Sequence, residues 1–276
     1  MDLKFVIDRI MLFYYTLSSK LEEVTVIRII VSVLAVLGCV SIRSALSQDR
    51  GSLYGWVVVL DPGHGGEDPG SSHFYNRQRV TEDEYVYDVM LRVRRIALAR
   101  GAIVFSTVRD NVGERNWHPS RVFPDLRNER FSLDNSIVRA GTAGLRKRLL
   151  YGNSINRRYP SHRRAWISIH FDVLGRNNQI DGVRIIAADT SLRLVETLER
   201  SFGGVRRLRD DNPIVGSGDR EYGIRRLFVL GPENNIREKV LIELGNFNNQ
   251  ADLWRVRNPV VRESYAFSIV RALEDY

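Results

Sequence analysis

The stretch that most constrains the fold of this chain is WVVVLDPGHGGEDPG, residues 56–70. Its apolar, β-branched first half is typical of a buried strand, and the Asp-Pro pair that follows is typical of the strand's end. His64 then lies among three glycines. Because glycine has no side chain, the backbone can turn sharply there and a ligand can approach the imidazole closely. Taken alone, the pattern is equally typical of a plain strand-to-loop turn with an incidental histidine.

Three further segments place a histidine or an acid at the end of an expected secondary-structure element. Residues 81–84, TEDE, have the pattern of a helix capping box, so Glu82 is expected in the first turn of a helix. His170 and Glu243 each stand near the end of an apolar run typical of a strand. A carboxylate in so apolar a strand costs free energy unless it is exposed or paired, which favours a functional role for Glu243.

Two histidines and one carboxylate are the ligand set of a catalytic zinc site that keeps its fourth position open. The chain has a single cysteine, which excludes an intrachain disulfide and a cysteine-rich zinc site. A metal must therefore depend on histidines and carboxylates, and His64 and His170 are the candidate histidines. Glu82, Glu84 and Glu67 are the candidates for the acid. Either histidine by itself is more often an ordinary core residue, so the prediction depends on the whole set.

Strand-like and helix-like segments alternate along the chain. The pattern predicts strands near 57–60, 102–107, 166–170, 182–187, 227–230 and 240–244, and helices at 82–100, 145–155, 191–202 and 259–273. This alternation predicts an α/β fold of three layers, with helices on both faces of a twisted, mostly parallel sheet. Ligand sites in such sheets lie beyond the carboxyl ends of the strands. We expect His64, His170 and Glu243 at that edge.

The first fifty residues differ from the rest. We interpret residues 1–50 as an N-terminal signal or anchor segment, and residues 51–276 as the folded domain, with an insertion at about 111–144. The apolar run fits the core of a signal peptide. A membrane anchor through residues 24–42 and a lipobox that lipidates Cys39 are alternatives, and a buried core helix is another. The signal peptide, the membrane anchor and the lipobox each predict an exported protein of the periplasm or cell envelope.

The chain carries a formal net charge of +8, which predicts affinity for polyanions such as an anionic cell wall or lipid surface. It shows no zinc-finger spacing, RNA-binding aromatic pattern or dense basic helix, so nucleic acid is not an expected partner. The polar insertion is too long for a structureless loop. It is expected to serve as a lid, a regulatory segment or a surface that contacts substrate, or to have no functional role.

Five blocks follow one another in an order typical of one enzyme family. They are LDPGHGGEDPG at 60–70, EDEYVYDV at 82–89, LRKR with the later GN at 145–153, SIH at 168–170, and VLIELG at 240–245 with its following asparagines. Over roughly residues 56–274, the chain resembles the zinc-dependent N-acetylmuramoyl-L-alanine amidases. The resemblance implies a bacterial cell-wall hydrolase that acts on peptidoglycan. Such an enzyme cleaves the amide between N-acetylmuramic acid and L-alanine of the stem peptide.

The resemblance also implies roles for individual residues. One Zn²⁺ per chain is held by His64, Glu82 and His170, and Glu243 is the general acid and base. Four further positions are expected to orient a histidine or to contact substrate: Asp61, Asp172, Arg226 and Asn248.

The chain departs from the family pattern at three places, of which the smallest is Gly245-Asn246-Phe247 where Gly-Phe-Leu is usual. Phe171 and Asp172 stand where the family commonly has Ala-Asn, and Gly231 stands where an arginine is usual. Two alternative functions therefore remain. One is a zinc peptidase that acts within the stem peptide. The other is a catalytically silent wall-binding or scaffolding protein that keeps the amidase fold.

Overall fold

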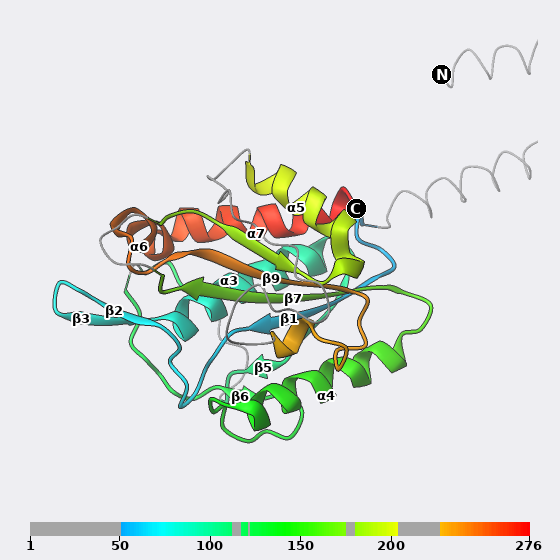
Figure 1. Cartoon of the computed structure of the whole chain (residues 1–276), viewed down its shortest axis with the longest axis horizontal. Helices are drawn as coiled ribbons and strands as arrows, with labels where there is room; N and C mark the ends of the chain where they lie inside the picture. Colours follow the sequence, from blue (N-terminus) through cyan, green and yellow to red (C-terminus); the bar gives the residue numbers. More distant parts are fainter. Residues whose placement is uncertain (1–50, 112–116, 121, 175–179, 204–226) are drawn as a thin grey trace, which may run out of the picture. The chain divides into compact units, whose positions relative to one another are not determined.

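Five strands form the central sheet of the computed structural model (Figure 1). The structure describes residues 51–111, 117–120, 122–174, 180–203 and 227–276. The order across the sheet is β4 (Ile103–Ser106), β1 (Trp56–Pro62), β7 (Arg163–Asp172), β9 (Glu238–Asn246) and β8 (Arg184–Ala187). The first four strands are parallel, and β8 pairs with β9 in the antiparallel direction. The predicted mostly parallel sheet is confirmed.

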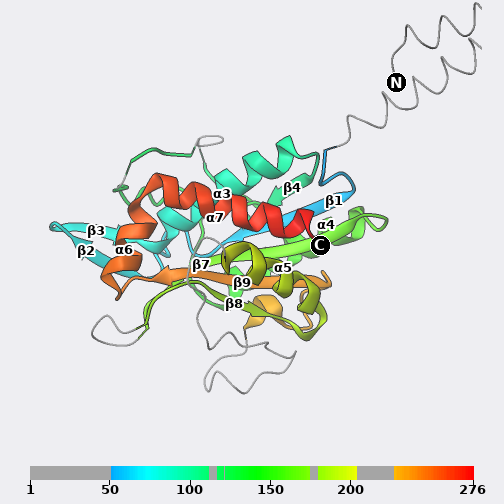
Figure 2. The same cartoon turned by 90° about the horizontal axis from the view of Figure 1, so that it is seen from above.

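Helices cover both faces of this sheet (Figures 1 and 2). One face carries α3 (Glu82–Ala99), α5 (Leu192–Gly203) and α7 (Pro259–Glu274), and the other carries α4 (Thr142–Arg158). The smaller elements are the hairpin β2 (Ser72–Tyr75) and β3 (Gln78–Thr81), the pair β5 (Val108–Arg109) and β6 (Arg130–Phe131), η1 (Asp189–Ser191), η2 (Phe228–Leu230) and α6 (Gln250–Arg257). The three-layer arrangement agrees with the prediction.

Side chains alternate between the two faces along each strand, as the pleat requires. In β1, Val58 and Leu60 join the core under α3 and α7, whereas Val57 and Val59 join the core under α4. The same alternation places His170 and Glu243 on the α4 side. Trp166 of β7 and Leu241 of β9 lie an even number of positions away from them and belong to the core under α4. Both predicted site residues therefore face the same layer.

The structure corrects two local predictions. Residues 227–230 are not a strand: Phe228–Leu230 is a 3₁₀ turn in which the Leu230 N–H donates to the Leu227 carbonyl at 2.9 Å. A short apolar run is ambiguous by pattern alone, and here it is buried against α4 without pairing in the sheet. Thr81 is the N-cap of α3, but its side chain makes no cap hydrogen bond. Glu84 instead accepts the N–H of Leu126 at 2.7 Å.

The described part of the insertion packs along α3 and α7. On α3, Asp88 accepts the N–H of His118 at 2.6 Å. On α7, Arg262 donates to the carbonyl of His118 at 3.1 Å. The Phe123 ring is buried against Tyr85, with ring centroids 4.7 Å apart. These contacts hold the segment against the domain, and α4 begins within the predicted insertion, at Thr142.

Residues 1–50 lie outside the described part of the chain, so the predictions for residues 24–42 and for Cys39 stay predictions. Among the residues that are described, none of the helices combines the length and apolarity that a bilayer-spanning segment needs.

Candidate metal centre

The loop after β1 is tightly constrained. His64 has φ of 66°, a left-handed conformation that is uncommon and strained for a residue other than glycine. Gly65, Gly66 and Gly70 also have positive φ, at 120°, 61° and 62°. Arg148 of α4 stabilises the loop, since its Nη2 donates to the His64 carbonyl at 2.6 Å. The glycine-rich sequence is thus needed for the turn that presents the His64 ring.

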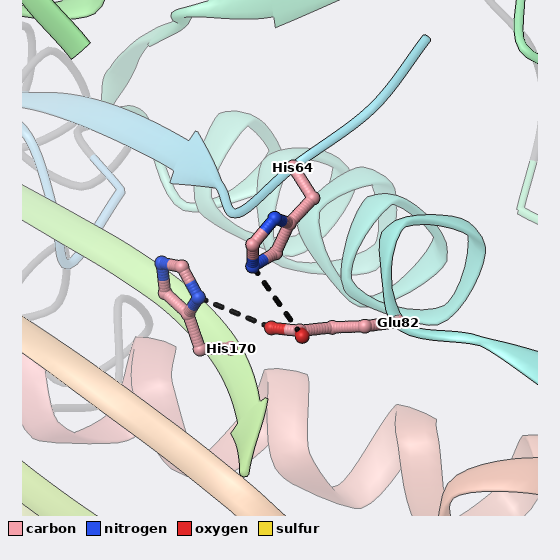
Figure 3. Close-up of side chains that lie close together, drawn as sticks. All are labelled: His64, Glu82 and His170. Atoms are coloured by element: carbon pink, nitrogen blue, oxygen red, sulfur yellow. Dashed lines mark hydrogen bonds and ion pairs between the residues drawn. The ribbon is translucent and has the colours of Figure 1, made fainter. Parts of the chain in front are cut away.

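Three side chains from three elements meet beyond the carboxyl ends of the strands (Figure 3). Nε2 of His64 lies 3.4 Å from Oε2 of Glu82, and Nδ1 of His170 lies 3.1 Å from Oε1. One ligand atom of each residue lies within 4.8 Å of the others. The structure therefore brings together the three residues that the sequence nominated as metal ligands.

Backbone donors fix the carboxylate of Glu82 between the two rings. The N–H of Ser71 donates to Oε2 at 2.9 Å, and the N–H of Phe171 donates to Oε1 at 3.0 Å. The Phe171 N–H can reach Glu82 because β1 ends at Pro62, opposite Ile169, and no β1 residue pairs with Phe171. A buried carboxylate with fixed orientation results.

The charges of the cluster depend on one another. Burial alone lowers the pKa of His64, but the carboxylates of Glu82 and Asp68 outweigh it and raise the pKa to about 10. Burial alone raises the pKa of Glu82, but the His64 and His170 rings hold it far below its usual range. A cation that binds the two imidazoles must displace a proton from this cluster. Two imidazoles and a carboxylate fit the donor set of Zn²⁺.

Asp68 is a member of this site that sequence reasoning missed. Its Oδ2 lies 3.0 Å from Nδ1 of His64, on the side of the ring away from Glu82. A carboxylate on the second nitrogen of a ligating histidine fixes its tautomer and orientation. The available signal was the four-residue spacing of His64 and Asp68 within one glycine-rich loop.

We expect Asp68→Ala to lower the affinity for Zn²⁺ by roughly 10- to 100-fold, because the His64 ring loses its orienting partner. Competition with a chelator of known affinity measures the change. Glu67→Ala is the matched control, since Glu67 lies next to Asp68 but its carboxylate pairs with Arg139 at 2.8 Å on the surface. Equal zinc affinities of the two variants would contradict a role for Asp68 at the metal.

Glu243 lies beside the cluster in the sheet. In the β7–β9 register it is the direct neighbour of His170, and in the β8–β9 register it is the neighbour of Arg184. Adjacent strands are about 4.8 Å apart and paired residues face the same side, so the acid lies next to a ligand histidine. Arg184 is buried and was not predicted, because the sequence does not reveal which strand pairs with β9 on its far side.

A pocket of about 890 Å³ opens beside the cluster. Its walls come from the loop after β1, the start of α4 and η2, and include His64, His170, Arg139 and Phe228. The cluster therefore has space for a large substrate on the α4 side of the sheet.

A family model described as N-acetylmuramoyl-L-alanine amidase (Amidase_3) matches residues 58–275. The chain belongs to this amidase family. A curated relative, an uncharacterized cell wall amidase of Bacillus anthracis, is 24% identical over 224 residues, which are 81% of this chain and 36% of the relative. The chain thus spans about a third of that relative's length.

Solved structures of amidases share the fold. The CwlD amidase of Clostridioides difficile, solved in complex with the GerS lipoprotein, has a TM-score of 0.55 and 20% identity, and the match covers 80% of this chain and 97% of that one. AmiC2 of Nostoc punctiforme has a TM-score of 0.54 and 19% identity, over 82% and 97% of the two chains. At these identities the likeness shows the common fold.

The remaining predicted site residues of this amidase-family chain are placed as follows. The Oδ1 of Asp61 accepts from Arg148 at 2.8 Å and its Oδ2 accepts from Ser168 at 2.7 Å. Its expected role in orienting a histidine or contacting substrate stays a prediction. Asp172 ends β7, two residues beyond His170. Asn248 lies in the turn after β9. Arg226 lies outside the described residues.

One departure from the amidase pattern has a structural explanation. The Phe171 ring stacks on Phe247, with centroids 5.4 Å apart, and both rings are buried in the core on the α3 side. The Phe171 ring therefore points away from the cluster, and the Phe171 N–H donates to Glu82. The alternative ligands Glu84 and Glu67 are engaged elsewhere, with Leu126 and Arg139.

Proposed function

We propose that this protein is a zinc-dependent amidase that cleaves the bond between N-acetylmuramic acid and the L-alanine of the peptidoglycan stem peptide. The observation that carries the proposal is the meeting of His64, Glu82 and His170 beside a large pocket, in a chain of the amidase family. The intact donor set favours an enzyme over a silent wall-binding protein.

The three clustered side chains would hold the metal, and Asp68 would orient the His64 ring. Zn²⁺ bound there would act as a Lewis acid that lowers the pKa of a water molecule toward neutrality and polarises the carbonyl of the substrate. Glu243 accepts the proton of the attacking water and then donates a proton to the leaving nitrogen of L-alanine. The products are a lactyl carboxylate and a free amino group, so the atoms of one water molecule are divided between them. The β-sheet register beside His170 supports this role for Glu243.

The substrate and location follow from the same family. Peptidoglycan fits the amidase family, and cell wall amidase relatives support an extracellular or cell-envelope location. We further propose that residues 1–50 serve as a signal or anchor segment for export, with residues 51–276 as the catalytic domain. The formal net charge of +8 favours binding to an anionic cell wall.

The proposal is tested by incubating the protein with purified peptidoglycan and following the release of soluble peptides. Release should stop after dialysis against a chelator and return when about one equivalent of Zn²⁺ is added. A protein that sediments with peptidoglycan in both conditions and releases nothing would be a wall-binding protein instead.

A further inference from the structure

A second group of carboxylates lies under the first turn of α3. Asp83 and Glu84 come from this turn, and Glu129 comes from the insertion. All three are buried, and one oxygen of each lies within 4.8 Å of the others. The group shares no residue with the cluster of His64, Glu82 and His170.

The polar atoms of Asp83 point to a missing ligand in this group. Asp83 is only 2% exposed, and neither of its carboxylate oxygens has a hydrogen-bond partner among the described residues. Two oxygens of the insertion, Oδ1 of Asp125 and Oδ1 of Asn128, are also buried without a hydrogen-bond partner among the described residues. Buried polar atoms are almost always paired, and an unpaired buried carboxylate is costly. The two Asp83 oxygens therefore need a partner that is positively charged or donates a hydrogen bond.

The geometry also sets the charges of the group against one another. One oxygen of each of the three carboxylates lies within 4.8 Å of the others, so the ionised groups repel one another. A cation between them would relieve this repulsion.

We infer that Asp83, Glu84 and Glu129 bind a hard divalent cation, Ca²⁺. The donors are all oxygens, which suit hard cations and not Zn²⁺ or Cu²⁺. Ca²⁺ accepts six to eight oxygens in flexible geometry, whereas Mg²⁺ demands a near-ideal octahedron and keeps much of its water. Three carboxylates from two separate segments fit the flexible coordination of Ca²⁺ better than the strict octahedron of Mg²⁺.

The bound cation would join the start of α3, which carries Glu82, to the insertion and to the loop that presents His64. Oε2 of Glu129 accepts the N–H of Gly66 at 2.9 Å, in the loop that presents His64. Oε1 of Glu84 accepts the N–H of Leu126 at 2.7 Å, in the insertion. The role of the cation is structural, and the inference does not depend on the proposed amidase activity.

The test uses the full-length protein, stripped of metals with a chelator and then given CaCl₂ alone. Isothermal titration should show one Ca²⁺ per chain. Thermal unfolding followed by circular dichroism should show a Tm rise of roughly 5–10 °C at Ca²⁺ a hundredfold above its Kd. MgCl₂ at the same concentration should give a smaller rise.

Variants assign the effect to the group. Asp83→Asn should abolish Ca²⁺ binding and the Tm rise. His64→Ala should keep both, because it changes only the zinc cluster. Asp134→Asn is the matched control in the same insertion, since Asp134 pairs with Lys147 at 2.8 Å on the surface, and it too should keep both.

Three results would overturn the inference. The first is a parent protein that binds no Ca²⁺ by titration, which would mean that the carboxylates share a proton instead. The second is an equal Tm rise in Asp83→Asn and the parent. The third is an equal rise with Mg²⁺ and Ca²⁺. The titration of the parent decides the first point even if a variant fails to fold.

Discussion

Glu243→Gln should lower the rate of amide cleavage by about 10²- to 10⁴-fold, the usual contribution of a general acid or base. Glutamine has nearly the same shape but cannot accept the proton of water or return one to the leaving nitrogen. Zinc content should stay near one per chain, because Glu243 is the sheet neighbour of His170 and not one of the clustered ligands. Peptide release and metal analysis on the same preparation measure both quantities.

Glu238→Gln is the matched control for this variant. Glu238 begins β9, the strand that carries Glu243, and is also largely buried. It lies at the opposite end of the strand from the cluster. The control should keep the parent's rate, and cleavage by Glu243→Gln at the parent's rate would remove Glu243 from the mechanism.

Gly63→Ala should abolish most zinc binding and activity. A Cβ at this position would lie 2.3 Å from Cε1 and 2.5 Å from Nδ1 of His170, distances that no packing tolerates. The ring must move, and a displacement of about 1 Å at a reacting centre costs roughly 10²-fold in rate. Zinc stoichiometry after gel filtration and the rate of peptide release measure the two effects.

Gly152→Ala separates this effect from a general loss of stability. A Cβ at Gly152 would lie 2.4 Å from Cζ3 of Trp166, under α4, so the clash is of similar severity against another aromatic ring. Overpacking of this kind costs about 1–3 kcal/mol, and both variants should unfold at lower temperature. Only Gly63→Ala should lose zinc. Similar zinc losses in both variants would contradict a specific contact between Gly63 and the His170 ring.

The parts of the site that sequence could predict are those at strand ends. His64 and His170 each follow an apolar run, and parallel strands bring their carboxyl ends to one edge of the sheet, so their meeting follows from the α/β pattern. Glu82 could be placed because it begins a helix with an acidic first turn. The fold class followed from the same alternation of strands and helices.

The parts that could not be predicted depend on contacts between distant segments. Arg184 becomes the neighbour of Glu243 only because β8 pairs with β9 in the antiparallel direction, which no local pattern encodes. Glu129 meets Asp83 across the insertion, 46 positions away in the printed sequence. Asp61 accepts a hydrogen bond from Arg148 of α4, 87 positions away in the sequence, a contact that no local pattern encodes.

Mass spectrometry of a digested, defined muropeptide tests most directly which bond the protein cleaves. We expect two products that together gain the mass of one water: the glycan with a free lactyl carboxylate, and the stem peptide with a free L-alanine amino group. Zn²⁺ should be required for both. Fragments cut within the stem peptide, with L-alanine still attached to N-acetylmuramic acid, would contradict the proposed function.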